Sequence, residues 1–354
     1  MNAGRDETIS SARQILERAI AGRLFPAATF VVGSSADAAW IEALGTLTFE
    51  RGSPPAGPGT PFDLASLTKV VATTTVLMEL ARAGRLRLDE PVAACFDEWR
   101  GPDREGVTVR DLLAHASGLP ARLIDAPPNS RREFEHDICR MPLEYVPRTR
   151  AVYSDLDFIL LGFIAANRGD APLAELFDRV VGIAGLTFEL PPGLKRLAAP
   201  TLPLMEDARR GRTLAGEVHD NYAAALGGAA GHAGLFGAAP AVGAFARVIL
   251  RAARGERDGP PPFSPELVAQ FTTKTAVPAS SRALGWDTML PSSSCGTRMS
   301  PGAFGHTGFT GTSLWIDPER DRYFVLLTNR ACGGGSLDDM RTVRRAFHDA
   351  LGAL

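Results

Sequence analysis

Lysine is scarce in this chain of 354 residues, because only three of its 38 basic residues are lysines. Cysteine is scarce too: the four cysteines are scattered and form no CxxC pair, which is typical of reduced thiols rather than of a disulfide framework. No run approaches the roughly 18 apolar residues of a membrane span, and Asp6 and Glu7 stand where a signal peptide would be apolar. These absences predict a cytoplasmic protein that does not insert into a membrane.

A surplus of charge of either sign is missing as well. The net charge is −2, and the basic residues form no run beyond short pairs such as Arg209 and Arg210. Such a chain has no electrostatic footprint for nucleic acid or for an anionic membrane surface. With 45% hydrophobic and 22% charged residues, the composition is that of an ordinary globular protein. We expect its partner to be a small molecule, and the oligomeric state stays open.

The two ends of the chain carry similar patterns. Apolar residues at helical spacing predict a first helix over about 9–20, and a last helix is predicted from Ser336, which resembles a capping box with Asp339. Strands are predicted at 28–32, 39–44, 312–316 and 323–328. Together the ends predict one antiparallel sheet flanked by the N- and C-terminal helices.

The middle of the chain is expected to be a large, mostly helical insertion. Candidate helices lie near residues 66–83, 108–114, 155–166, 172–181 and 240–254. Residues 187–236 are Gly-rich without clear periodicity, which favours functional loops. The predicted fold class is therefore α+β, an α/β sandwich with a helical insertion. We expect residues 1–61 plus 256–354 to form the sheet domain and 62–255 the helical domain, with the active site in the cleft between them.

Lys69 is the only charged residue in an apolar helical segment from Leu64 through Met78. Burial there disfavours the charged form, so we expect a neutral amine to be accessible near pH 7, which an arginine could not provide. Ser66 lies three residues earlier on the same helical face, within hydrogen-bonding reach. This SxxK spacing predicts a nucleophile and its base, although a core helix with a snorkelling lysine would look the same.

Two further motifs carry polar side chains next to glycine or an apolar helix. The segment from Tyr153 to Asp155 precedes an apolar helical run, where Ser154 and Asp157 would form a capping box with or without a catalytic role. His306, Thr307 and Gly308 precede the C-terminal hairpin. Glycine there permits close approach of a substrate to the backbone, or simply a bulge or turn.

Five segments follow one another along the chain: FDLASLTK, LLAHASGLP, YSD, GHAGLFG and GHTGFTGT. Their order resembles that in the class C β-lactamase-like serine hydrolases, which include penicillin-binding proteins and several esterases, and the resemblance covers nearly the whole chain. It implies the DD-peptidase/β-lactamase fold and catalysis without a metal or cofactor. It also implies that Ser66 is the nucleophile, Lys69 its base and Tyr153 the proton carrier to the leaving group. The backbone N–H groups of Ser66 and Phe309 would hold the oxyanion.

Two departures from the family pattern bear on the substrate. His306 stands where similar β-lactamases carry Lys, so a permanent cation is replaced by a group that is mostly neutral at pH 7. Asp155 stands where Asn is usual, and a carboxylate would favour the charged form of Lys69 and repel an anionic substrate group. We therefore expect small esters or amides as substrates, with esterase activity ahead of β-lactam hydrolysis.

Other readings stay open. A β-lactamase or D-amino-acid peptidase acting on peptidoglycan-type substrates is one, and a non-catalytic penicillin-recognising sensor is another. A Ser-His-Asp hydrolase is disfavoured because the chain has no GxSxG elbow. Glu217, His219, Asp220 and His232 show no metal-ligand spacing, so we expect a loop lining the cleft rather than a metal site. We expect His115 to be structural.

Overall fold

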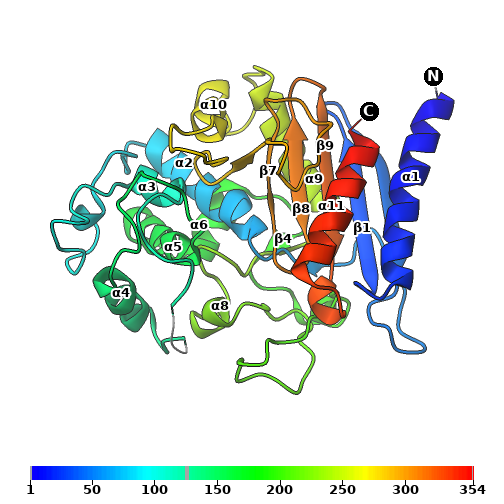
Figure 1. The fold of residues 1–354 in the computed structure, drawn as a ribbon, viewed down its shortest axis with the longest axis horizontal. Helices are drawn as coiled ribbons and strands as arrows, with labels where there is room; N and C mark the ends of the chain where they lie inside the picture. Colours follow the sequence, from blue (N-terminus) through cyan, green and yellow to red (C-terminus); the bar gives the residue numbers. More distant parts are fainter. Residues whose placement is uncertain (1, 124–126, 353) are drawn as a thin grey trace.

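Both ends of the chain build the main sheet. The structure is a computed structural model that describes residues 2–123, 127–352 and 354. Six antiparallel strands follow the order β2-β1-β9-β8-β7-β6, so the first strand of the chain pairs with the last one (Figure 1). The strands are β1 Ala27–Gly33, β2 Ala38–Gly45, β6 Asp287–Thr288, β7 Phe304–Thr307, β8 Ser313–Asp317 and β9 Arg322–Thr328. A small second sheet, ordered β3-β5-β4, consists of β3 Phe62–Asp63, β4 Leu186–Thr187 and β5 Phe236–Gly237.

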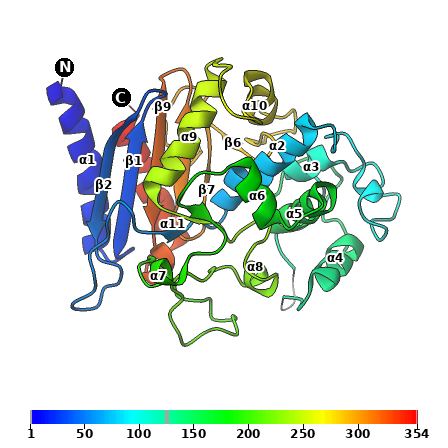
Figure 2. The same cartoon turned by 180° about the vertical axis from the view of Figure 1, so that it is seen from behind.

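Helices cover both faces of the main sheet. The described α-helices are α1 Asn2–Ala21, α2 Thr75–Arg82, α3 Val109–Leu113, α4 Arg131–Arg140, α5 Asp155–Gly169, α6 Leu173–Val180, α7 Pro192–Lys195, α8 Asn221–Ala225, α9 Ala239–Ala253, α10 Pro265–Thr272 and α11 Leu337–Leu351. The neighbouring helices α1 and α11 cover one face and α9 covers the other (Figures 1 and 2). Along β1, Phe30 and Val32 pack in the cluster with α1 and α11, whereas Val31 packs in the core with α9. This alternation between two covered faces makes the fold an α/β sandwich, as predicted.

The remaining helices form a mostly helical region beside the sheet. The four helices predicted after residue 100 are present as α3, α5, α6 and α9, whereas α4, α7, α8 and α10 were not predicted. The helix α9 lies in the predicted helical insertion by sequence but packs on β1 and β9 of the sheet. The proposed division into residues 1–61 plus 256–354 and 62–255 stays a prediction.

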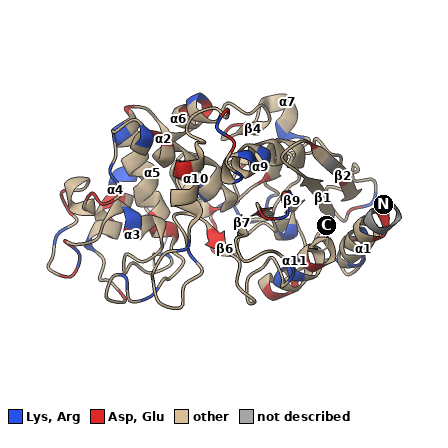
Figure 3. Ribbon diagram, turned by 90° about the horizontal axis from the view of Figure 1, so that it is seen from above, with Lys and Arg blue, Asp and Glu red and all other residues tan. Residues whose placement is uncertain are grey.

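The charged residues and the cysteines are arranged as we expected from the sequence. Basic and acidic residues are interspersed along the helices and loops (Figure 3). All four cysteines are free thiols. Within the residues that the structure describes, no helix has both the length and the apolar character needed to cross a membrane.

Threonine hydroxyls join the sheet to the helical region next to Ser66. Thr310 Oγ1 donates to the Asp63 carbonyl at 2.7 Å, and Thr312 Oγ1 donates to the Leu64 carbonyl at 2.9 Å. The loop after β7 is thereby fixed against the chain that leads from β3 to Ser66. This junction places the sheet edge and the helical region on two sides of the same serine.

Candidate active site

Ser66 lies at a sharp turn rather than inside the helix predicted over residues 66–83. Ala65 before it has a φ of 48°, a left-handed conformation that residues other than glycine rarely adopt. The helix then opens with a π-helical segment, Lys69–Thr74, before continuing as α2. This segment is anchored by Thr73, whose Oγ1 donates to a carbonyl of the loop before β5 at 2.6 Å. Strained backbone and π-helical turns are concentrated at functional sites.

The Lys69 side chain is fully buried and contacts three separate segments. Its Nζ donates to Ser66 Oγ at 3.0 Å, to Asp155 Oδ1 at 2.7 Å and to the His232 carbonyl at 3.2 Å. Three acceptors match the three N–H groups of an ammonium. Burial alone would lower the pKa of Lys69, but the Asp155 carboxylate and the Tyr153 phenol raise it above its ordinary value. The expectation of a neutral amine near pH 7 is therefore wrong, because Asp155 keeps Lys69 charged.

Asp155 opens α5 and belongs to a network of charges. Its second oxygen accepts from Arg122 Nη1 at 2.9 Å, and the same Nη1 lies 3.0 Å from Asp220. Asp220 also contacts His232 Nε2 at 2.8 Å. Burial would raise the pKa of Asp155, but Lys69, His232 and Arg122 hold it below its ordinary value. Because two cations share this carboxylate, the predicted repulsion of an anionic substrate by Asp155 is weakened.

The Tyr153 segment is held in place by His115, as expected of a structural histidine. His115 Nδ1 accepts the Ser154 N–H at 3.1 Å, and the His115 ring centroid lies 4.7 Å from that of Tyr153. Ser154 is the N-cap of α5, since its Oγ accepts from the Asp157 N–H at 3.3 Å. The predicted capping box is incomplete, because the Asp157 carboxylate accepts from the Ser117 hydroxyl at 2.5 Å instead. Burial raises the pKa of Asp157 well above its ordinary value.

Tyr153 lies between Lys69 and His306. Its ring centroid is 4.8 Å from Lys69 Nζ and 5.8 Å from the His306 ring centroid. His306 Nδ1 lies 2.8 Å from the Thr307 carbonyl, so this nitrogen carries the proton. His306 Nε2 is then a buried acceptor without a partner among the described residues. Burial and the nearby Arg282 lower the pKa of His306 well below its ordinary value, so the ring is neutral at pH 7, as expected.

The predicted oxyanion donors face the same pocket. Neither the Ser66 nor the Phe309 backbone N–H has an acceptor in the part of the chain that the structure describes, and both residues line the pocket. A Cβ on Gly308 would lie 2.1 Å from Thr312 Oγ1 and 2.6 Å from the Leu64 carbonyl. Only glycine therefore lets this loop pack so closely beside Ser66. The oxyanion role of the two N–H groups stays a prediction.

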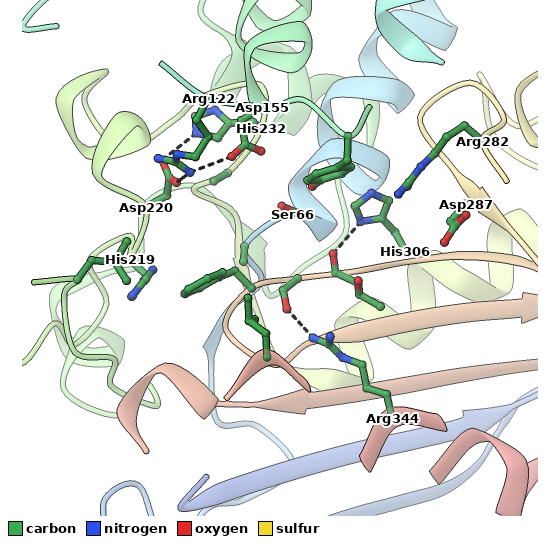
Figure 4. A pocket seen from close by; sticks show the side chains of 18 residues that line it. Ser66, Arg122, Asp155, His219, Asp220, His232, Arg282, Asp287, His306 and Arg344 are labelled. Atoms are coloured by element: carbon green, nitrogen blue, oxygen red, sulfur yellow. Dashed lines mark hydrogen bonds and ion pairs between the residues drawn. The ribbon is translucent and has the colours of Figure 1, made fainter. Parts of the chain in front are cut away.

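The pocket is lined by both apolar and charged residues. Its cavity of about 270 Å³ is lined by Ser66, Tyr153 and Asp155, by the apolar residues Leu204, Phe309 and Leu337, and by the charged residues Arg122, Arg282, Asp287 and Arg344 (Figure 4). The structure thus brings together all the predicted site residues, with Lys69 buried beneath them. The three arginines could not be predicted from the motifs, because each comes from a segment outside them. Only their surplus over lysine could have drawn attention to arginine.

The Gly-rich loop lines the cleft, as expected. His219, Asp220 and His232 all face the pocket, and the His219 ring stacks on Phe309 with a centroid distance of 5.2 Å. Glu217 does not line it and pairs instead with Arg212 at 2.7 Å. The described residues contain no group of three or more His, Cys, Asp or Glu side chains placed to hold a metal ion.

Comparisons with known proteins place this geometry in a wider context. A family model described as Beta-lactamase matches residues 12–348. A putative D-alanyl-D-alanine carboxypeptidase of Escherichia coli (strain K12) is 32% identical over 306 residues, which cover 77% of this chain and 69% of the relative. The solved structure of EstCE1, a hydrolase with promiscuous acyltransferase activity, matches with a TM-score of 0.77 and 18% identity over 99% of this chain and 100% of that one. A class C beta-lactamase from Rhodobacter sphaeroides matches with a TM-score of 0.76 and 19% identity over 96% and 98%. At such identities the solved structures show a shared fold.

The charge state of Lys69 gives a direct test of the network. Because Asp155 raises the pKa of Lys69, Asp155→Asn should lower that pKa, so that the amine deprotonates at a lower pH. The chain has only three lysines, and ¹⁵N-lysine labelling therefore gives few side-chain resonances, among which Lys69 is identified by its loss in Lys69→Arg. Asp220→Asn is the matched control, since Asp220 contacts Arg122 and His232 but not Lys69. A neutral Lys69 at pH 7 in the native protein would contradict this account.

Proposed function

Because this chain belongs to the beta-lactamase family, we propose that it is a serine hydrolase that forms an acyl-enzyme at Ser66 on small esters or amides. The contact that carries this proposal is the 3.0 Å hydrogen bond between Lys69 Nζ and Ser66 Oγ at the floor of the pocket. A serine beside a buried amine, with two unpaired backbone N–H groups facing the same cavity, has the parts that nucleophilic acyl transfer requires.

Acylation requires that Ser66 lose its proton as Oγ attacks the carbonyl carbon of the substrate. A charged Lys69 cannot accept that proton, because the nitrogen of an ammonium group has no free lone pair and acts only as a donor, here to three acceptors. We therefore assign the acceptor role to the Tyr153 oxygen. This requires the form of the enzyme in which Lys69 is charged and the Tyr153 phenol has given up its proton. Lys69 then acts as the cation that stabilises the negative charge next to it. Tyr153 thereby takes over the role of base that the sequence suggested for Lys69, and it keeps the delivery of the proton to the leaving group.

The later steps use the same groups. The N–H groups of Ser66 and Phe309 hold the oxyanion, a contribution of about 3–4 kcal/mol per donor in other serine hydrolases. Tyr153 passes the proton to the leaving group, so the acyl group stays on Ser66 and the alcohol or amine departs. Water then attacks the acyl-enzyme carbonyl, gives its proton to Tyr153 and releases the acid. The proton returns to Ser66 and the cycle closes.

Neutral esters suit the apolar residues of this pocket. Leu204, Phe309 and Leu337 line it and offer apolar contacts to a short acyl chain. The neutral His306 provides no cation for a substrate carboxylate. A neutral ester loses nothing by these features, which supports esterase activity ahead of β-lactam hydrolysis.

One observation favours a second candidate, a peptidase that removes a C-terminal D-amino acid. The Arg282 guanidinium lines the pocket, lies 5.1 Å from the Tyr153 ring centroid, and forms no ion pair among the described residues. A free guanidinium is suited to bind a carboxylate in two hydrogen bonds. It supplies the cation that the exchange of lysine for His306 removed. The name of the Escherichia coli relative agrees with such a substrate.

The nucleophile is tested by covalent labelling. We expect a fluorophosphonate probe to modify Ser66 and no other serine, and Ser66→Ala to abolish both labelling and hydrolysis of p-nitrophenyl butyrate. Tyr153→Phe should slow the hydrolysis by about 10²- to 10⁴-fold, the usual contribution of general acid–base catalysis. Peptide mapping that locates the probe on another residue would refute the assignment. Intact mass measurement after an activated ester also separates an enzyme, which sheds its acyl group, from a sensor that retains it.

The substrate class is tested by comparing kcat/KM across matched compounds. We expect p-nitrophenyl butyrate to be hydrolysed faster than nitrocefin and faster than a D-alanyl-D-alanine peptide. Arg282→Gln should weaken turnover of the peptide with a free carboxylate but not of its C-terminal amide, because only the carboxylate can pair with the guanidinium. If the native protein prefers the free peptide to the ester, and Arg282→Gln reverses that preference, the peptidase candidate replaces the esterase.

A further inference from the structure

Two buried arginines lie behind the loop 308–312, and neither has a carboxylate partner among the described residues. Arg344 on α11 donates from Nη2 to the Gly308 carbonyl at 2.5 Å and to the Thr312 carbonyl at 2.9 Å. Arg330 donates from Nε at 3.0 Å and from Nη2 at 2.6 Å to the Phe309 carbonyl. Only 7% of each residue is exposed. No ion pair to either arginine forms within residues 2–123, 127–352 and 354.

Such an arrangement is costly. A buried charge is normally paired with an opposite charge, because taking it out of water costs several kcal/mol that backbone carbonyls only partly return. Burial lowers the pKa of both guanidinium groups, and Arg344 Nε has no hydrogen-bond partner among the described atoms. Neutral side chains could bridge the same carbonyls at lower cost. The positive charge itself therefore calls for a physical reason.

Arg344 can polarise the peptide group that joins Gly308 to Phe309. The Gly308 carbonyl and the Phe309 N–H belong to one planar peptide group, whose electrons are delocalised between oxygen and nitrogen. A charged donor on the oxygen draws electron density from the nitrogen, and hydrogen bonds in such a chain strengthen one another. The Phe309 N–H, which faces the pocket, becomes a stronger donor. Arg330 acts on the next peptide group, whose N–H belongs to Thr310.

We propose that Arg344 is a positioning residue that polarises the peptide group between Gly308 and Phe309 and so strengthens the Phe309 N–H as an oxyanion donor. This inference rests on the proposed function, because only an acyl-transfer reaction develops an oxyanion at that place. Arg344 also lines the pocket, but this role requires no contact between its side chain and the reacting atoms. Its charge reaches the reaction through the peptide group.

The experiment compares three variants on p-nitrophenyl butyrate, which has no carboxylate that Arg344 could bind directly. Arg344→Gln keeps a donor but removes the charge, Arg344→Lys keeps the charge, and Arg330→Gln is the matched control on the neighbouring peptide group. Losing a whole oxyanion donor costs about 10²–10³ in kcat, and polarisation by a charged hydrogen bond is a fraction of that. We expect Arg344→Gln to lower kcat/KM roughly tenfold, and both other variants to stay within about threefold of the native protein.

The affinity for a transition-state analogue is a second measurement, which should not change if Arg344 has only a structural role. Butylboronic acid forms a tetrahedral adduct with Ser66 that presents a negatively charged oxygen to the same N–H groups. Its affinity should fall in Arg344→Gln by the same factor as kcat/KM, while KM for the ester changes little. Thermal unfolding and circular dichroism report whether each variant folds. If Arg344→Gln does not fold, Arg344→Lys decides, because retained charge must then retain activity and boronate affinity.

Several outcomes would overturn the inference. Equal losses in Arg344→Gln and Arg330→Gln would show that both arginines merely support the loop. A loss in Arg344→Lys as large as in Arg344→Gln would show that charge is not the relevant property. A loss confined to carboxylate-bearing peptides would make Arg344 a substrate-binding residue. Failure of the proposed function is distinguishable, because the native protein would then show no Ser66-dependent hydrolysis at all.

Discussion

The buried Lys69 ammonium is the interaction on which the rest of the site depends. Its three hydrogen bonds join the turn at Ser66, the start of α5 at Asp155 and the loop carbonyl of His232, segments that are far apart in the sequence. Burying a cation costs several kcal/mol unless it is paired and its donors are satisfied, as those of Lys69 are. The position of the nucleophile and the electrostatics of the pocket are therefore coupled. The Lys69 ammonium that positions Ser66 also requires opposite charges around itself.

Each buried charge in this network is paired with an opposite charge on the next residue. Asp155 neutralises Lys69 but is itself buried, and it accepts a second hydrogen bond from Arg122. Arg122 in turn lies against Asp220. A neutral asparagine in place of Asp155 would need neither partner, so the exchange makes sense only together with Arg122. The substrate consequences of Asp155 cannot be judged from that residue alone, because what a ligand meets is the sum of the network rather than an isolated carboxylate.

Local patterns made much of the fold predictable from the sequence. Apolar runs next to turn residues located the four longer strands, and the Ser336 capping box with Asp339 is present at the start of α11. The helix α4 was missed because only Phe134, Ile138 and Cys139 of its residues are buried, too few for a clear periodicity. At the site, the motifs located the residues that the structure brings together. Contacts between distant segments carry no local signal, which is why Arg122, the charge of Lys69 and the arginines of the pocket could not be predicted.

The single lysine of the site is explained by shape as well as by proton transfer. Around Lys69 three acceptors converge at 2.7 to 3.2 Å on one atom, an arrangement that suits a compact ammonium. A guanidinium spreads five donors over a plane, so an arginine there would leave some of them buried without partners. The sequence argument that arginine cannot lose its proton thus identified the right residue, although Lys69 is charged at rest. A chain rich in arginine retains lysine at this position because three acceptors converge on one donor atom.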